Sequence, residues 1–168
     1  MRYRLSTLAL AVVTVLALVS AAPAQSTPTA NAFVVNGAVT TPLTLTAADL
    51  RRFPARQVWV RFESGTGTQR HHYVGARLFD VLTAAGPRFD PAVKNHKLTF
   101  AALVAATDNY RSLVAWAEFD PDFAGTEVLL AYREDGQRLD RPRLVVPGDR
   151  KGGRYVSDVT EVELIGQP

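Results

Sequence analysis

Short segments of β-forming residues, separated by tight turns, recur along most of this chain and constrain its fold more than any other feature. The clearest pair is residues 57–62 (QVWVRF) and residues 69–74 (QRHHYV), in which β-forming and polar residues alternate. A turn-forming stretch, residues 64–67 (SGTG), lies between them. Alternating segments joined by such a stretch predict an antiparallel hairpin.

Similar patterns predict further strands at residues 33–35, 43–45, 98–106, 110–115, 128–132, 143–146 and 155–164. Helical patterns are limited to a capped start at residues 46–50, an amphipathic segment at residues 77–85 and a short turn at residues 116–119. Strands and helices do not alternate regularly, so a doubly wound parallel sheet is not expected. The predicted fold class is α+β, mainly β with two or three short helices.

The first residues have the layout of a secretory signal peptide. Arg2 and Arg4 precede an apolar run at residues 8–19, and small residues around Ala24 form a cleavage site. The run is shorter than the roughly 20 residues that a membrane-spanning helix needs, which disfavours a permanent anchor. We therefore predict a signal peptide at residues 1–24, a flexible lead at residues 25–32 and a single domain at residues 33–168. The mature protein would be exported to the periplasm or the outside, without a membrane span.

Charge and cysteine content exclude several functions. Removing Arg2 and Arg4 with the signal peptide lowers the formal net charge from +3 to +1. The remaining arginines are interleaved with acids, so no nucleic-acid partner is expected. The chain contains no cysteine, which excludes disulfides, a thiolate nucleophile and a zinc–thiolate site.

A set of short motifs occurs in a fixed order between about residues 36 and 164. The set comprises Gly37-x-Val39-x-x-Pro42-Leu43, Asp49-Leu50, Tyr73-x-Gly75, Ala85-Gly86, Asp108-Asn109-Tyr110, and Pro142-Arg143 followed by Pro147. In order and spacing these motifs resemble the sulfite-oxidase-like family of molybdopterin-binding domains. The resemblance implies that family's fold for residues 33–168.

The same resemblance implies a cofactor whose molybdenum is bound by a cysteine sulfur. The corresponding place in this chain falls within Phe62, Glu63 and Ser64, none of which is a thiol. A serine hydroxyl is a poor soft ligand and would not replace the sulfur. The segment expected near the pterin also carries an acid, Asp158, and the two arginines of the leader are not adjacent as they are in leaders that export folded protein. We therefore expect no cofactor, with molybdopterin as the alternative.

Two other catalytic or metal-binding arrangements are not favoured by the sequence. His71 and His72 are neighbours on a predicted strand, so their side chains point to opposite faces and cannot bind one ion together. Ser64 lacks the G-x-S-x-G pattern of a nucleophile elbow, and a solvated hairpin turn explains it better than a catalytic triad. We predict no catalytic residue and no metal ligand.

Two groups of residues remain as candidate binding sites. Ser64, Asp108, Tyr110 and Arg143 are predicted to line a remnant of the family's cofactor cleft, although a local turn and a structural ion pair would also explain them. The glycine-rich stretch at residues 148–154 could bind an anion through Arg150, Lys151 and Arg154, or be an ordinary loop.

The sequence thus predicts an exported, cofactor-free module that binds a small anionic or polar ligand or an envelope protein. The alternatives are a molybdopterin-dependent oxidoreductase with a cysteine-free site, and a structural envelope domain. Surface exposure of Trp59, Trp116 or Phe119 would favour the structural domain.

Overall fold

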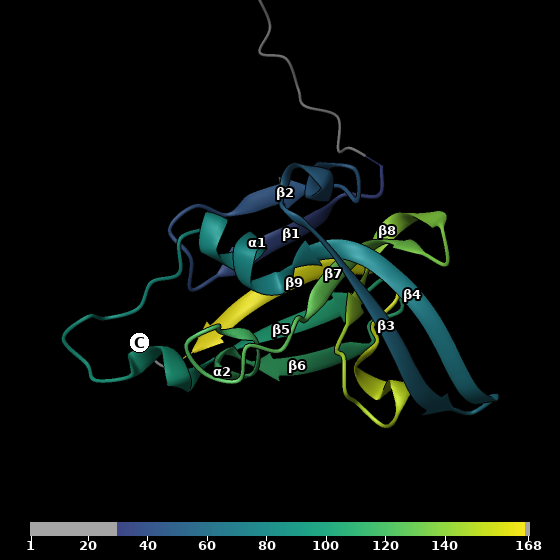
Figure 1. The fold of residues 1–168 in the computed structure, drawn as a ribbon. Coiled ribbons are helices and arrows are strands. Elements are labelled where there is room, and N and C mark those ends of the chain that lie inside the picture. Colours follow the sequence, from purple (N-terminus) through teal and green to yellow (C-terminus); the bar gives the residue numbers. More distant parts are fainter. Residues whose placement is uncertain (1–29, 167–168) are drawn as a thin grey trace, which may run out of the picture.

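The computed structural model of the protein describes residues 30–166 and contains two β-sheets (Figure 1). The predicted signal peptide and residues 25–29 of the predicted lead lie outside this range. None of the helices in the described part of the chain is long and apolar enough to cross a membrane.

The first sheet has five strands in the order β2-β1-β9-β5-β6. Their bounds are β1 (Phe33–Gly37), β2 (Leu43–Leu45), β5 (Phe100–Ala106), β6 (Arg111–Ala115) and β9 (Val159–Gly166). The central strand β9 pairs parallel with β1 and antiparallel with β5, so the two ends of the domain meet in one sheet. Val162 and Leu164 of β9 are buried in the main core, as the alternation in the sequence predicts.

The second sheet has four strands in the order β3-β4-β7-β8. Their bounds are β3 (Ala55–Ser64), β4 (Gly67–Arg77), β7 (Leu129–Glu134) and β8 (Gln137–Val145). The predicted hairpin is confirmed as β3 and β4, which pair from Ala55 with Ala76 to Ser64 with Gly67. Gly67, the first residue of β4, has a positive φ of 101°, a backbone conformation that glycine adopts without strain.

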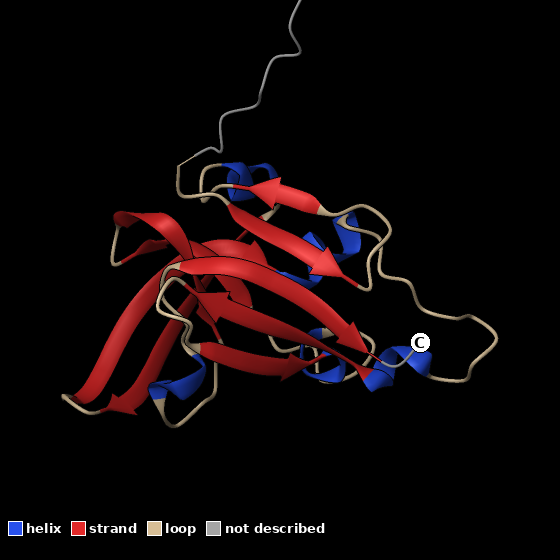
Figure 2. Cartoon of the chain, turned by 180° about the vertical axis from the view of Figure 1, so that it is seen from behind, coloured by secondary structure: helices blue, strands red, loops and turns tan. Residues whose placement is uncertain are grey.

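Two α-helices, α1 (Leu78–Ala84) and α2 (Trp116–Phe119), lie at the margins of the sheets (Figure 2). Three 3₁₀ segments accompany them: η1 (Asp49–Arg52), η2 (His96–Thr99) and η3 (Gly152–Arg154). The capped start predicted at Thr46 is confirmed, since the N–H of Asp49 donates to the Thr46 hydroxyl and the Thr46 N–H donates to the Asp49 carboxylate. The segment that follows is a 3₁₀ turn, shorter than an α-helix.

Three predicted strand boundaries were wrong. The predicted strand at residues 143–146 is the end of β8, which already begins at Gln137. The predicted strand at residues 98–106 begins at Phe100, because the preceding residues form η2. The predicted strand at residues 155–164 begins only at Val159, because Asp158 has a positive φ of 49° that interrupts the extended chain. The Val156 carbonyl instead accepts a backbone hydrogen bond from the N–H of Leu144. This bond holds the segment before β9 against the end of β8.

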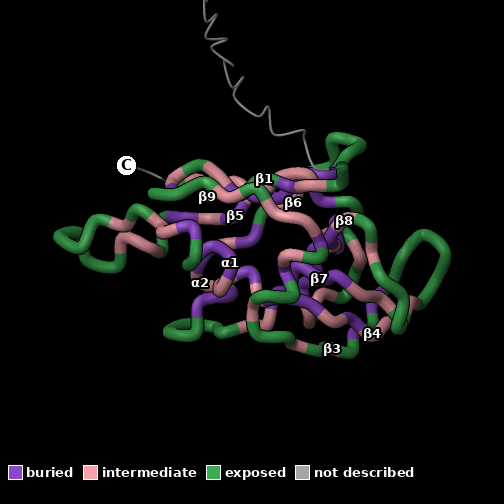
Figure 3. Tube along the Cα trace, turned by 90° about the horizontal axis from the view of Figure 1, so that it is seen from above, coloured by how far each residue is buried: buried purple, intermediate pink, exposed green. Residues whose placement is uncertain are grey.

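Buried residues gather between the two sheets, as Figure 3 shows in purple. The main core joins both sheets with α1 and α2. A smaller core lies on the second sheet and contains Phe62, Tyr73, Leu129, Val145 and Tyr155. The predicted mainly β, α+β fold is confirmed, and the smaller core forms the floor of the candidate site.

Candidate functional site

Three adjoining cavities form a cleft where β3 ends, beside β8 and the segment of residues 151–158. Their volumes are about 670, 400 and 200 Å³. The first two share Gly152 and Tyr155, the last two share Ser157 and Asp158, and Arg143 lines the first and third. We call this arrangement the Tyr155 cleft. All four predicted cleft residues line it: Ser64 and Arg143 line the first cavity, and Asp108 and Tyr110 line the second.

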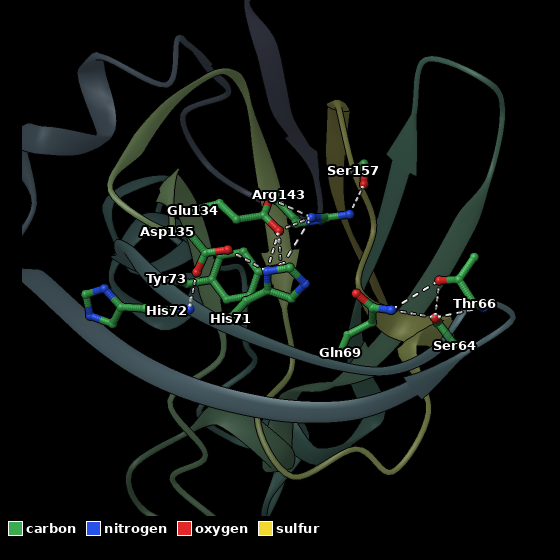
Figure 4. Close-up of polar contacts among 10 residues, drawn as sticks. All are labelled: Ser64, Thr66, Gln69, His71, His72, Tyr73, Glu134, Asp135, Arg143 and Ser157. Atoms are coloured by element: carbon green, nitrogen blue, oxygen red, sulfur yellow. Dashed lines mark hydrogen bonds and ion pairs between the residues drawn. The ribbon is translucent and has the colours of Figure 1, made fainter.

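Arg143 is held in a polar network on one face of the second sheet (Figure 4). Its Nη1 donates to both carboxylate oxygens of Glu134, at 2.7 and 2.6 Å, and its Nη2 donates to the Ser157 hydroxyl at 2.6 Å. The Tyr73 hydroxyl also donates to Glu134, at 2.8 Å. Burial raises the pKa of Tyr73 although the Arg143 charge opposes the shift, so this phenol stays protonated. The ion pair that would explain Arg143 structurally is therefore present.

The His71 side chain extends this network, whereas His72 joins it only through its backbone N–H, which donates to Asp135 at 2.8 Å. The Nδ1 of His71 lies 2.8 Å from Asp135 Oδ2 and 3.2 Å from Glu134 Oε1. His72 stacks on Trp59 with ring centroids 4.5 Å apart, which confirms that the two histidines face opposite sides of the strand. His71, Glu134 and Asp135 offer three possible metal-ligand atoms within 4.8 Å of one another. The Glu134 carboxylate is already neutralised by Arg143, which disfavours a cation there.

The Ser64 hydroxyl is occupied by the hairpin turn itself. It donates to the Gly67 carbonyl at 3.0 Å, accepts from the Thr66 N–H at 3.2 Å and receives a longer bond from the Gln69 amide. His71 points instead into the network of Glu134 and Asp135 (Figure 4). The geometry therefore favours a hairpin turn over a catalytic triad.

Aromatic rings lie at one end of residues 62–64, the stretch in which the family resemblance implies a cysteine ligand. Phe62 is only 7% exposed and stacks on Tyr155, with ring centroids 4.2 Å apart. A Cβ atom at Gly152 would lie 2.8 Å from the Phe62 ring, so this glycine lets the loop close over the stack. Glu63 accepts a hydrogen bond from the Thr68 hydroxyl, and its N–H donates to the Arg150 carbonyl. This donor set contains no thiol and does not fit a sulfur-bound molybdenum.

The burial of Tyr155 also affects its hydroxyl. Desolvation and the nearby Asp149 charge raise the pKa of Tyr155 to about 12, so the phenol is neutral at physiological pH. Its hydroxyl and the Nε of Arg143 are buried polar atoms without a hydrogen-bond partner in the described part of the protein. These two atoms are the unsatisfied polar groups at the base of the cleft.

Asp108 and Tyr110 shape the turn between β5 and β6. The Asp108 carboxylate accepts the Tyr110 N–H at 2.9 Å, and Asn109 between them has a positive φ of 66°. The Tyr110 hydroxyl donates to the Gly153 carbonyl at 2.6 Å and so ties this turn to η3. The predicted aspartate turn is present, and it also forms one wall of the cleft.

The three cations of the predicted anion loop have different environments. Arg154 forms ion pairs with Asp149 and Glu118, both at 2.7 Å. The hydrogen bonds that Arg154 donates to Asp149 and to Glu118 raise the pKa of Arg154 despite its partial burial, so its charge is used within the fold. Lys151 is exposed, lines the first cavity and forms no ion pair with a described residue, whereas Arg150 does not line the cleft. Only Lys151 remains as an anion ligand facing the cleft.

Sequence reasoning missed Glu134, Tyr155 and Ser157. Glu134 lies between the strands predicted at residues 128–132 and 143–146, and an acid next to Asp135-Gly136 gives no sign of its partner. Only the pairing of β7 with β4 and β8 places it opposite Tyr73 and near Arg143. Tyr155 was assigned to a strand, whereas it lies in the segment that closes the cleft.

The largest described cavity, of about 910 Å³, lies elsewhere, between the end of β9 and the loop after α1. None of the predicted site residues lines it.

Comparison with known proteins identifies the family. The sequence model described as "Oxidoreductase molybdopterin binding domain" matches residues 20–168. The chain belongs to this family. The fold is similar to that in the crystal structure of the sulfane dehydrogenase SoxCD from Paracoccus pantotrophus, with a TM-score of 0.66 and 21% sequence identity. No significant match was found among curated proteins.

The likeness to SoxCD covers 85% of this chain but only 40% of the SoxCD chain. The predicted sulfite-oxidase-like fold and family resemblance are thus confirmed. This molybdopterin-binding family member departs from the expected ligand set at Phe62, Glu63 and Ser64, where the chain offers an aromatic ring, a carboxylate and a hydroxyl.

Proposed function

We propose that this protein is a cofactor-free member of the molybdopterin-binding family that works as an exported accessory module and binds a small organic anion in the Tyr155 cleft. The observation that carries the proposal is the Phe62–Tyr155 stack, which closes the place of the expected cysteine ligand in a chain without any thiol. A cleft that offers aromatic surface and cationic side chains but no thiol is suited to binding an anion.

The lining of the first cavity suggests the class of ligand. Phe62 and Tyr155 supply apolar surface, and Lys151 supplies a cation without an acidic partner among the described residues. Arg143 adds a guanidinium whose charge is balanced by Glu134. A carboxylate or sulfonate with a small apolar body would place its charge beside Lys151 and its body on the two rings.

The decisive test of cofactor content is elemental analysis for molybdenum, with a fluorescence assay for released pterin. The sample is mature protein purified from the envelope of its own host. We expect neither molybdenum nor pterin near one equivalent per chain. Stoichiometric amounts of both would overturn the proposal and establish the alternative, a molybdopterin-dependent oxidoreductase with a cysteine-free site, which the family membership favours.

The ligand class is tested by calorimetric titration with benzoate and benzenesulfonate. Lys151→Ala is expected to weaken binding of both probes about tenfold, because it removes the cation that faces the cleft. Arg150→Ala is the matched control, since this neighbouring arginine does not line the cleft. Equal loss in both variants would show that the anions respond only to overall charge.

Export is also part of the proposal, and its support is the leader-like layout of residues 1–24. Cell fractionation with N-terminal sequencing of the mature protein tests it, and we expect the chain to begin at Gln25. A protein recovered from the cytoplasm with Met1 intact would contradict export.

A further inference from the structure

One edge of the second sheet is open along most of its length. β3 is the outermost strand and lies at the rim of the molecule (Figure 3). In an antiparallel pair, alternate residues direct their backbone groups away from the partner strand. Glu63 does so, since its N–H donates to Arg150 outside the sheet. By the same alternation, the backbone groups of Gln57, Trp59 and Arg61 face outward, and no described residue forms a backbone hydrogen bond with them on that side.

An exposed tryptophan lies on this edge. Trp59 is 80% exposed, although it is one of only two tryptophans in the chain. Its ring stacks on His72, and the His72 Nε2 lies 3.1 Å from the Gln57 side-chain oxygen. The indole is thus held in place and presented to solvent. Exposed, ordered aromatic rings are typical of protein-binding surfaces.

Four arginines, one on each strand of the second sheet, lie on the same face as Trp59. The strand register places Arg61 opposite Arg70 and Arg133 opposite Arg138. Like charges directly opposite each other destabilise a sheet. Arg61 lies 4.0 Å from Glu63, but the other three form no ion pair within the described residues. We call Arg61, Arg70, Arg133 and Arg138 the arginine face.

Protection of the edge against aggregation does not explain this arrangement. A charged residue on an edge strand does discourage unwanted pairing, and that would account for Arg61. It does not account for Arg70 and Arg133, which lie on the interior strands β4 and β7. A large exposed indole on the edge would also favour association. The unpaired charges therefore point to an acidic partner.

We propose that the β3 edge and the arginine face bind an extended acidic segment of a partner protein, which adds to the sheet as a further strand. Side chains on one side of that segment would lie beside Trp59 and Arg61, where carboxylates are favoured. Those on the other side would lie beside Val58 and Val60, where apolar residues are favoured. The expected partner sequence alternates acidic and apolar residues. A second copy of this chain is disfavoured, because antiparallel pairing of two β3 edges would place two arginine faces side by side.

The test uses the full mature chain and follows the emission of Trp59, in a Trp116→Phe background that removes the buried second indole. The probe is a capped peptide of alternating glutamate and valine. We expect its binding to shift the emission to shorter wavelengths and to weaken as salt is added. A peptide of the same composition with its glutamates in one block is expected to bind at least about tenfold more weakly, since only the alternating order fits an added strand.

Two pairs of variants separate charge from strand pairing. The double reversal Arg61→Glu with Arg70→Glu is expected to weaken binding at least about tenfold, whereas Arg88→Glu with Arg111→Glu, an equal charge change elsewhere on the surface, is not. Gln57→Pro removes an outward backbone N–H and is expected to abolish binding. Gln57→Ala is the control, because it loses the same side-chain contact with His72 but keeps the N–H, and it is expected to bind normally. Thermal unfolding verifies that each variant is folded.

Three outcomes would overturn the proposal. One is equal affinity for the alternating and block peptides. Another is a shift of the Trp59 emission to shorter wavelengths with vesicles of phosphatidylcholine and phosphatidylglycerol but not with the peptide. That result would mean that the arginine face binds a membrane surface. The third is a dimer of the unmodified chain in analytical ultracentrifugation that Gln57→Pro dissociates, which would assign the edge to self-association. None of these outcomes depends on what the Tyr155 cleft binds.

Discussion

The Nη1 atom of Arg143 lies 2.6 Å from the Oε2 atom of Glu134, and this ion pair joins β8 to β7 at the base of the Tyr155 cleft. Both side chains are largely shielded from solvent, and the Tyr73 hydroxyl shares the same carboxylate. The pair lies beside an irregularity in the β7–β8 register between Ala131 and Arg133. It therefore supports the sheet where the backbone ladder is interrupted.

Arg143→Met is expected to reduce the free energy of unfolding by about 2 kcal/mol, because it leaves the half-buried Glu134 carboxylate without its cation. Urea unfolding followed by circular dichroism measures the change. Arg138→Met is the control on the same strand, where an exposed arginine without an ion pair should cost less than about 0.5 kcal/mol. Equal effects in the two variants would show that the ion pair contributes little.

Gly75→Ala is expected to reduce the free energy of unfolding by about 2 kcal/mol or more, because the added Cβ would lie 2.5 Å from the Leu130 carbonyl oxygen and 2.7 Å from the Ala131 Cα. Both are backbone atoms of the paired strand β7 and cannot move independently. Gly65→Ala provides the comparison, since a Cβ there meets no atom within 4 Å. Thermal melts of the two variants check the prediction. It fails if Gly75→Ala and Gly65→Ala have the same melting temperature.

Asp120 is expected to make stability fall in acid. Burial alone would raise the pKa of Asp120, but hydrogen bonds from Lys97, from the Asp122 N–H and from the Trp116 indole hold it below the ordinary 3.8. A carboxyl whose pKa is lowered by folding stabilises the protein above its unfolded pKa, and this contribution is lost as the pH falls through its folded pKa.

Urea unfolding between about pH 6 and about pH 2 should therefore show a smaller loss of stability for Asp120→Asn than for the unmodified protein. Asp140→Asn removes an exposed carboxylate without an ion pair among the described residues and serves as the control. If Asp120→Asn and the unmodified protein lose the same amount, the proposed role of this carboxylate in acid stability is wrong.

The two tryptophans should report different environments. Trp116 is 2% exposed and its indole donates to Asp120 at 2.6 Å, whereas Trp59 is 80% exposed. In Trp59→Phe the remaining emission should be blue-shifted and resistant to acrylamide, at a cost in stability below about 0.5 kcal/mol. In Trp116→Phe the remaining Trp59 emission should be quenched by acrylamide. This variant should lose about 1–3 kcal/mol of the free energy of unfolding, because the buried Asp120 carboxylate loses a hydrogen-bond donor. Similar quenching in both variants would contradict the exposed position of Trp59.

The positions of most strands could be predicted because they depend on local periodicity. The alternation in residues 57–62 and 69–74 requires only that one face be buried, and the structure confirms the hairpin. The boundary at Asp158 could not be predicted, because a positive φ in an aspartate leaves no periodic signal. The candidate cleft was found from the family motifs, since Ser64, Asp108, Tyr110 and Arg143 all line it.

What each of these side chains contacts could not be predicted in the same way. The Arg143 guanidinium meets Tyr73, 70 positions earlier in the chain, and the Tyr110 hydroxyl meets Gly153, 43 positions later. Such contacts depend on which strands pair and in which register, and a one-residue shift in register would turn each side chain to the other face.

The sequence by itself determined a mainly β fold through its local periodicity and the absence of thiolate chemistry through its composition, because neither needs knowledge of distant contacts. It determined the molybdopterin-binding family through the order and spacing of its motifs. Only the tertiary structure decided that Phe62 stacks on Tyr155, that Arg154 is paired within the fold and Lys151 is not, and that Trp59 lies exposed among arginines. The physical reason is that packing and charge pairing join residues distant in sequence, and only the completed sheets bring them together.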